Sequence, residues 1–311
     1  MSASTKKRTY GAAHFALELD GNENVGFFHS IEGGGIKAEV KTHQTGNQIR
    51  EWSQIGYPKY EDIKIQVGMS MSSSFYSWIA AFFRGETVRK TGAVLAGDFR
   101  YKERARREMY EMLISEVSMP GLDAQNKSAC HMGVTIVPER VIFKPGSNEE
   151  IPPANSGDAQ KLWTPSNFMV RIDGFEEACK RVIKVDAFTI KSQIHEHRVG
   201  NMRDAIRVPG RLELPTMSIH VPESDVQPFT DHFVKYTQRG APQVAPRLTG
   251  EVEFRDHDGR GLCSVEMAGL DIVSMSPSKS ESKTDDVKTV KIEFSLEVMT
   301  FSYDRRPATS A

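Results

Sequence analysis

Few residues of this chain have a type and spacing that could do chemistry. His195 and His197 in "HEH" would point to the same side of a β-strand, where two imidazoles could bind a metal ion with a third ligand. No further ligand lies at a useful spacing from this pair, and histidines are common at strand ends. We therefore expect no metal site, and no sequence pattern points to a cofactor.

The pair Cys130-His131 places a thiol beside a potential base. Adjacent residues on a strand face opposite sides, whereas a nucleophile needs its base within hydrogen-bond reach. Cys130, Cys179 and Cys263 are too few and too unpatterned for a disulfide framework, which suits a reducing cytoplasm. We expect all three to be small core residues.

The run Gly33-Gly34-Gly35 resembles part of a phosphate-binding loop, but no Lys-Ser or Lys-Thr follows it and no helix starts there. A tight turn or a bulge between strands explains it better. No catalytic signature such as Gly-x-Ser-x-Gly or His-Glu-x-x-His is present. The sequence therefore predicts that the protein is not an enzyme.

The strongest charge feature is "RYKERARRE", which begins at residue 100. Cationic side chains at this density could bind nucleic acid by displacing counterions from phosphates. However, Glu103 and Glu108 dilute the patch, the chain has a net charge of −1, and no pattern of stacking aromatics follows. We expect a solvated loop, a lumen lining or a contact with a neighbouring subunit, rather than sequence-specific nucleic-acid binding, from Arg100, Lys102, Arg104, Arg106 and Arg107.

Composition is that of a soluble globular protein large enough for two domains. Hydrophobic residues make up 39% and charged residues 26% of the 311 positions. No apolar run approaches the roughly 18 residues that a membrane span needs. The basic N-terminus is not followed by the apolar segment of a secretory signal. We expect no membrane association.

The sequence motifs of the first half of the chain recur in the second half, and this repeat gives the order of the expected strands and helices. "FALELDG" at Phe15 returns as "FMVRIDG" at Phe168, and each is typical of a half-buried strand that runs into an Asp-Gly turn. At a constant offset of 154 positions, "HQTGN" returns as "HRVGN" and "IKIQV" as "MSIHV". A helical stripe of Phe75, Trp78, Ile79 and Phe82 returns as Phe229, His232, Phe233 and Tyr236. This constancy indicates a tandem duplication.

The repeat divides the chain into an N-terminal extension (1–14), a first domain (15–143), a linker (144–167), a second domain (168–303) and a C-terminal tail (304–311). The linker is rich in Pro, Gly, Ser and Asn. We expect strands at 15–19, 36–40, 63–69, 109–117, 134–143, 168–172, 185–194, 212–221, 250–255, 262–274 and 287–301. A helix is expected at 75–83, followed by a Gly85 C-cap.

The fold class is therefore mainly β with one helix per domain (α+β), in two tandem small β-barrels or sandwiches. The strand at 287–301 has no counterpart in residues 144–167. We expect either that the first copy lacks this strand or that another segment supplies it.

The ordered features from Phe15 to Ile79 resemble the tail-tube proteins of contractile phages and phage-derived injection systems. They are "F…DG", the Pro turn in "GYPKYED", the alternating "IKIQV", the Gly-Met turn and the aromatic helix around Trp78. The resemblance covers 15–143 well and 168–301 more loosely, because His232 replaces the Trp and Val221-Pro222 replaces the Gly-Met turn. It implies small barrels, one per chain, in rings of six that stack into a hollow tube inside a sheath. Two barrels in one chain depart from that pattern.

The resemblance implies a structural protein whose rings build, start or cap the inner tube of a contractile tail. It would assemble in the cytoplasm with itself, in a hexameric ring, and with tube, baseplate or sheath proteins, and cargo could pass through its lumen. We favour six chains whose two barrels stack in two layers, since the copies diverge. The alternatives are a hub-like adaptor, in which three chains mimic a six-barrel ring, and a two-domain cargo-binding module.

Two long polar excursions between strands, at 41–56 and 195–210, exceed a normal hairpin turn. We expect them to contact neighbouring subunits, although mobile surface loops would have the same composition. The residues predicted for this contact are His43, Gly46, Asn47, Arg50, Trp52, His197, Gly200, Asn201 and Arg203.

Overall fold

The computed structural model describes residues 14–21, 23–44, 51–69, 71–152, 163–238, 247–278 and 287–303. The predicted extension, apart from its last residue, and the predicted C-terminal tail lie outside these ranges. The described chain is mainly β with few helices, as expected. No helix in the described ranges is long and apolar enough to cross a membrane.

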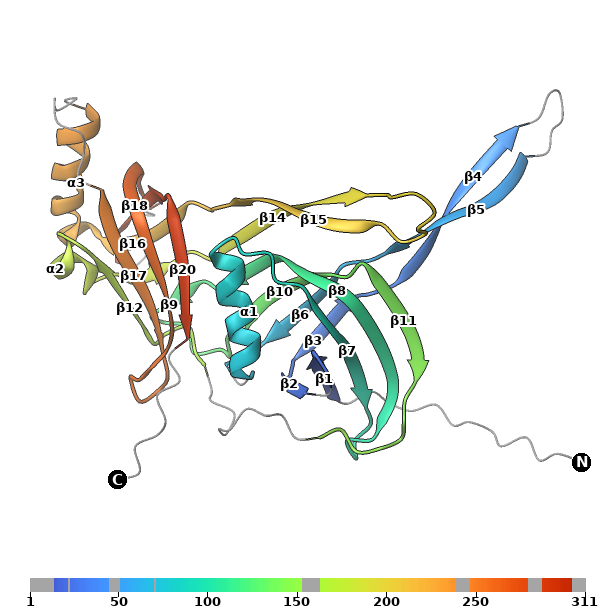
Figure 1. Cartoon of the computed structure of the whole chain (residues 1–311). Helices are drawn as coiled ribbons and strands as arrows, with labels where there is room; N and C mark the ends of the chain where they lie inside the picture. Colours follow the sequence, from blue (N-terminus) through green and yellow to red (C-terminus); the bar gives the residue numbers. More distant parts are fainter. Residues whose placement is uncertain are drawn as a thin grey trace, which may run out of the picture.

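The first domain is a curved sheet with the strand order β2-β1-β7-β8-β10-β6-β3, and β11 pairs with β8 (Figure 1). One helix, α1 (Ser73–Phe83), packs beside it, and a long hairpin of β4 (Ile36–Gln44) and β5 (Glu51–Tyr60) forms its own two-stranded sheet. The other strands are β1 (His14–Leu19), β2 (Glu23–Phe27), β3 (Ser30–Gly33), β6 (Ile63–Val67), β7 (Lys90–Gly97), β8 (Glu103–Met119), β9 (Leu122–Asp123), β10 (Met132–Val137) and β11 (Arg140–Pro145).

The second domain has the strand order β12-β17-β18-β19-β16-β13, and β20 pairs with β18. Its hairpin is β14 (Phe188–His197) with β15 (Ile206–Glu213). Its helices are the short α2 (Glu176–Cys179) and α3 (Gln227–Phe233), which continues as a π-helical turn over Val234–Gln238. The remaining strands are β12 (Phe168–Ile172), β13 (Lys184–Val185), β16 (Met217–Pro222), β17 (Leu248–Arg255), β18 (Gly261–Pro277), β19 (Thr289–Ser295) and β20 (Val298–Tyr303).

The two domains share irregularities as well as strand order. Glu111 in β8 and Gly269 in β18 both adopt positive φ, 51° and 68°, at the same place in their strands. The hairpins also have a register shift at matching positions, between Ala38 and Val40 and between Ser192 and Ile194. Bulges re-aim a strand and are specific features of a fold.

The strand expected at 287–301 is interrupted by a bend at Leu296–Glu297, which divides it into β19 and β20. Both run antiparallel along β18, and the register continues across the bend, where the Glu297 N–H donates to the Ala268 carbonyl. Their counterparts in the first domain are β10 and β11, since both pairs border the long strand in the same order. The first domain therefore lacks no strand: another segment, β10 and β11, supplies it, which is the second of the two alternatives expected.

The helix α1 forms because its apolar residues recur at helical spacing, and it ends as predicted at Gly85. The φ of Gly85 is +73°, and the Gly85 and Glu86 N–H groups donate to the carbonyls of Phe82 and Ala81. These two hydrogen bonds satisfy carbonyl groups that the end of the helix would otherwise leave unpaired.

The expected burial of the two helical stripes is confirmed in the first domain and only partly in the second. Phe75, Ile79 and Phe82 are buried. In α3 only Phe229 is buried, whereas Phe233 and the following Tyr236 are half-buried. The reason lies in what covers each helix, because α1 packs against β20 of the other domain.

Candidate assembly interface

The two domains are joined by a strand pairing that runs across the domain boundary. Residues 188–191 of β14 pair antiparallel with residues 119–116 of β8, so the hairpin of the second domain extends the sheet of the first. The Ser118 and Thr189 hydroxyls lie 3.0 Å apart across this pairing, and Lys191 Nζ lies 3.6 Å from Glu116 Oε2. Main-chain bonds of this kind give affinity, and the facing side chains give specificity.

Apolar side chains fill the junction. Phe188 and Ile190 from β14 are 4% and 0% exposed, and Val117 of β8 is 0% exposed. A second short pairing joins β13 to β9, with Val185 opposite Leu122. The larger of two buried clusters consequently continues through both domains.

The helix α1 and the strand β20 form the second contact between the domains. Tyr76 stacks on Tyr303 with 3.9 Å between ring centroids, and the Phe83 and Phe301 centroids are 5.5 Å apart. The Tyr76 hydroxyl also donates to the Gly68 carbonyl at 3.1 Å. Burial raises the pKa of Tyr76, so its hydroxyl stays protonated as a donor.

Beyond the pairing, the hairpin β14–β15 runs across the first domain (Figure 1). Glu139 holds it there by accepting from the Arg207 backbone N–H at 2.8 Å and from Arg89 Nη1 at 2.5 Å. Arg89 also donates to the Arg207 carbonyl. One arginine and one carboxylate of the first domain thus clamp β15.

The end of this hairpin lies on the base of the other hairpin. The Tyr60 hydroxyl donates to Asp204 Oδ1 at 2.8 Å, and Arg203 Nη2 donates to the Gly56 carbonyl at 3.3 Å. The Arg198 guanidinium lies 4.4 Å from the Tyr57 ring centroid. Burial, with the Asp204 carboxylate as a second cause, raises the pKa of Tyr60 to about 12.

The structure places the predicted interface residues in different environments. Arg203 contacts the other domain, whereas His43 and Trp52 face each other across β4–β5 and are exposed. Gly46, Asn47 and Arg50 lie outside the described residues. His197, Gly200 and Asn201 are exposed at the end and turn of β14–β15. Whether these residues contact a neighbouring subunit stays a prediction.

The predicted basic segment is largely paired within the first domain. Arg104 Nε and Nη2 donate to Asp98 Oδ2 at 2.9 and 2.7 Å, and this hydrogen bonding lowers the pKa of Asp98 to about 2. Arg106 pairs with Glu18 and lies 3.6 Å from Glu108.

The other basic residues of this segment donate hydrogen bonds to several partners. Arg107 donates to the Gly33 carbonyl at 3.2 Å. The backbone N–H groups of Arg100 and Lys102 both donate to Asp98 Oδ1, and their side chains are exposed. This internal pairing weakens the segment as a nucleic-acid patch, and its role in a lumen or a subunit contact stays a prediction.

No cluster of three or more potential metal ligands occurs among the described residues. The buried Cys130, Cys179 and Cys263 are free thiols, as expected of core residues. Burial raises the pKa of Cys130 to about 11 and that of Cys179 to about 12, so both are protonated at neutral pH.

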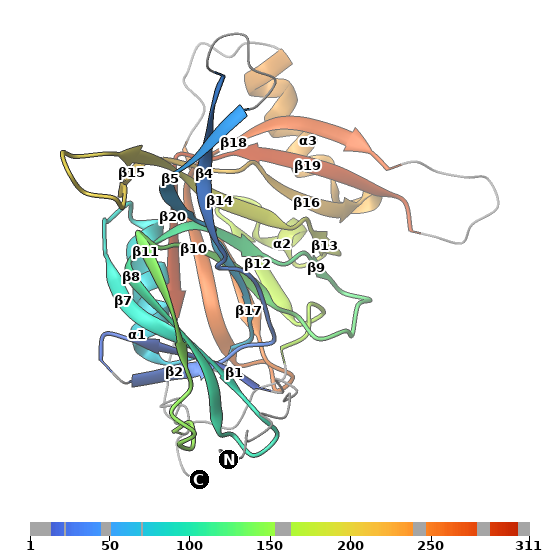
Figure 2. The same ribbon diagram turned by 90° about the vertical axis from the view of Figure 1, so that its right-hand side faces the viewer.

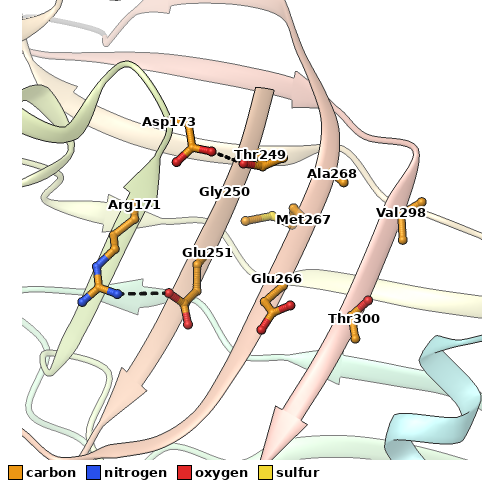
Figure 3. A pocket seen from close by; sticks show the side chains of 10 residues that line it. All are labelled: Arg171, Asp173, Thr249, Gly250, Glu251, Glu266, Met267, Ala268, Val298 and Thr300. Atoms are coloured by element: carbon orange, nitrogen blue, oxygen red, sulfur yellow. Dashed lines mark hydrogen bonds and ion pairs between the residues drawn. The ribbon is translucent and has the colours of Figure 1, made fainter. Parts of the chain in front are cut away.

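A shallow hollow of about 370 Å³ lies on the outer face of the second domain's sheet (Figure 3). Arg171 crosses from β12 to Glu251 on β17 at 3.3 Å, and Thr249 bonds Asp173. These are cross-strand pairs between neighbours, which stabilise a sheet without creating reactivity. The hollow is lined by Arg171, Asp173, Thr249, Gly250, Glu251, Glu266, Met267, Ala268, Val298 and Thr300.

The residues that carry the domain junction were not predicted from the sequence. Ile36-Lys37 and Ile190-Lys191 are the same dipeptide at the 154-residue offset, each at the start of a hairpin. This signal lay beside the polar excursions and could have directed attention to the hairpin bases.

Residues 11–141 match the sequence model of a family described as T4-like virus tail tube protein gp19. The match spans the first domain and somewhat less than half of the chain. It confirms the tail-tube resemblance of that domain and does not test the tandem duplication. A comparison with curated proteins finds no match to the chain.

Solved structures of contractile injection systems are similar at low identity. A chain of the PVC sheath-tube complex, an extracellular contractile injection system in the extended state, is 15% identical, with a TM-score of 0.40, covering 47% of this chain and 99% of that one. A chain of the anti-feeding prophage tube-terminating cap is 16% identical, with a TM-score of 0.39, covering 47% and 100%. A chain of the anti-feeding prophage baseplate is 10% identical, with a TM-score of 0.35, covering 45% and 95%.

Proposed function

We propose that this protein is a structural component of the inner tube of a contractile phage tail or injection system. The proposal starts from the tail-tube domain in the N-terminal part of the chain. Its rings would build, start or cap the tube. The family match over residues 11–141 supports this role. The function would be assembly without chemistry, because strand edges that would otherwise be unpaired form hydrogen bonds with strands of neighbouring subunits.

The second domain is proposed to be a second copy of the first. The shared strand order, the matching hairpin shifts and the bulges at Glu111 and Gly269 support this. A chance resemblance between two β domains would not reproduce a positive φ at the same point of the same strand. We propose the domain limits inferred from the sequence, with the first domain extended from 143 to Pro145, where β11 ends, and the second beginning at Phe168 with β12.

The pairing of β14 with β8 supports one of the two proposed ring arrangements. It joins the two domains laterally through a shared sheet, as neighbours around a ring would be joined. This favours three chains that mimic a six-barrel ring, the adaptor-like arrangement, over the six chains in two layers that the divergence of the copies suggested.

The same proposal sets the partners and the place of the protein. It would assemble in the cytoplasm and then form part of the particle, in contact with tube, baseplate or sheath proteins. No enzymatic role is proposed, because the family that matches residues 11–141 is described as a tail tube protein. A cargo-binding role has no observation of its own to favour it.

Ring size tests the proposal. The purified chain should form closed rings in electron micrographs, with a mass by light scattering of three times the 34.8 kDa of one chain. Rings of six chains in two layers would restore the stacked arrangement. A protein that remains a monomer at high concentration, alone and with tube proteins, would contradict the tube function.

A further inference from the structure

We propose that the unpaired edge of β18 at residues 271–277 is the docking site for the hairpin β4–β5 of a second copy of this chain. Copies would then join head to tail, each repeating between chains the junction that it contains between its own domains. This inference rests on the proposed ring function and names the surfaces that close the ring.

The receiving edge is the counterpart of the edge that β14 occupies. Residues 116–119 of β8 pair with β10 on one side and with β14 on the other. Residues 271–277 of β18 pair with β19 on one side, and no described strand pairs with their other side. Val273 is 50% exposed there, and Met275 is half-buried. β18 and β19 run out together to one side of the molecule (Figure 2).

The hairpin β4–β5 is the counterpart of β14–β15 but has no described strand beside it. Ile36 is 42% exposed, whereas Ile190, at the matching position of the other hairpin, is 0% exposed beneath the first domain. Large apolar side chains are costly to leave in water, and a group of them on one element marks a contact surface. The exposed large hydrophobic residues of this hairpin are Ile36, Val40, Trp52, Ile55 and Tyr57.

A separate contact points to the same two faces. Phe301 in β20 is 2% exposed because Tyr76 and Phe83 of α1 cover it. Phe143 in β11, its counterpart by strand register, is 55% exposed. The uncovered phenylalanine lies in the domain that carries the free hairpin. The helix α3, whose Phe233 is half-buried, lies in the domain that carries the free edge.

The arrangement of these surfaces fits a second copy better than an unrelated protein. The free hairpin and the free edge lie at opposite ends of the molecule in Figure 1. One chain therefore carries both halves of a junction whose completed form is visible between its own domains. Contacts of this heterologous kind close into a ring when the rotation between copies allows it. With two domains in each chain, three chains complete a six-domain ring.

The internal junction also predicts the register between chains. Ile190 lies opposite Val117 in the completed junction. Ile36 corresponds to Ile190, and Met275 corresponds to Val117, because the bulges at Glu111 and Gly269 fix the alignment of β8 with β18. Ile36 of one copy should therefore lie directly opposite Met275 of the next. Directly opposed antiparallel residues have Cα atoms about 4.5–5.5 Å apart, within the range that a disulfide spans.

Disulfide trapping tests this register in the full chain. The double variant Ile36→Cys/Met275→Cys should form, under mild oxidation, a covalent species of three chains with no free ends. The native cysteines are buried and should not compete. The matched control is Ile36→Cys/Val298→Cys, whose second position is 53% exposed but lies on β20, away from the free edge. Ring size is measured on the same samples before oxidation.

The outcomes separate this interface from the proposed function. Trapping at least tenfold above the control, with closure at three chains, would support the interface. Intact rings whose trapping does not exceed the control would overturn the interface and leave the ring function standing. An open ladder of cross-linked chains would overturn closure at three. A protein that stays monomeric would overturn both proposals. As a second variant, Phe143→Asp should weaken ring formation at least tenfold, whereas Phe99→Asp, which lies in the β7–β8 turn, should not.

Discussion

The ring of Tyr76 in α1 stacks on the ring of Tyr303 in β20, with 3.9 Å between their centroids. This contact joins the helix of the first domain to the last strand of the second. Together with the β8–β14 pairing, it makes the two domains share one core. Domains joined in this way should unfold as one unit, unlike domains connected by a linker alone.

Substituting Tyr76 tests this coupling. Tyr76→Ala should lower the free energy of unfolding by about 3–5 kcal/mol, because it removes a fully buried aromatic side chain. Urea unfolding followed by tryptophan fluorescence and by circular dichroism should show a single transition that moves as a whole. A variant with two separate transitions, of which only one has moved, would show that the domains unfold independently. Phe99→Ala, at an 81% exposed position, is the control.

The contact between the hairpins should make stability depend on pH in the alkaline range. The folded chain holds the Tyr60 proton more tightly than the unfolded chain, because its pKa is raised from 10.0 to about 12. The contribution is therefore fully present below pH 10.0 and falls as the pH rises from there to about 12.

Tyr60→Phe should remove that slope and cost about 1 kcal/mol at neutral pH, the worth of one hydrogen bond. The measurement is the unfolding midpoint of both proteins across this pH range. Asp204→Asn should bring the tyrosinate titration of Tyr60, followed by ultraviolet absorbance, closer to its ordinary range. Parallel pH curves for Tyr60→Phe and the unchanged protein would mean that the contact does not form in solution.

The two helices offer a comparison between a covered and an uncovered stripe. Phe82→Ala should cost about 3–5 kcal/mol in the free energy of unfolding, because Phe82 is 6% exposed. Phe233→Ala should cost clearly less in the isolated chain, since Phe233 is half-buried. Chemical denaturation of the single chains measures both. Equal losses would mean that α3 is as well covered as α1.

Local patterns in the sequence predicted many of the elements, but they predicted neither β5 and β7 nor the junction. The alternation of Ile63, Ile65 and Val67 predicted β6, whose exposed and buried residues alternate without exception. The bend between β19 and β20 was not predicted, because the alternation of apolar and polar residues continues into it and neither Gly nor Pro marks it. A strand was expected at 134–143, where β10 and β11 lie, but its equivalence to 287–301 was not recognised because the offset between the two domains changes after the helix.

The pairing of β14 with β8 depends on which edge is left free after each sheet has formed. That property belongs to the folded sheet, because a strand shows the same alternation whether its edge is paired or open. The exposed state of Ile36 and the buried state of Ile190 illustrate this. The two share a local sequence and differ only in what the rest of the chain places beside them.

The bulges at Glu111 and Gly269 allow a last prediction, in which substitutions at these equivalent positions change the stability in opposite directions. Glu111 adopts a φ of 51°, a backbone conformation that costs a residue with a side chain about 1–2 kcal/mol. Glu111→Gly relieves this strain but gives the unfolded chain more freedom, worth about 0.4–1 kcal/mol. The net expectation is a stabilisation of about 0.5–1 kcal/mol. Its ion pair with Arg89, at 3.9 Å and half-exposed, contributes little.

Gly269→Ala should act in the opposite direction. Its φ is +68°, and a Cβ atom there would lie 2.6 Å from Cγ of Glu297 at the bend between β19 and β20. We expect a loss of about 1–2 kcal/mol from the backbone alone, and more if the turn cannot move away. Calorimetric melting of both variants gives the two signs in one experiment. A stabilising Gly269→Ala would mean that β18 does not contain the bulge of β8, and the equivalence of the two strands would fail with it.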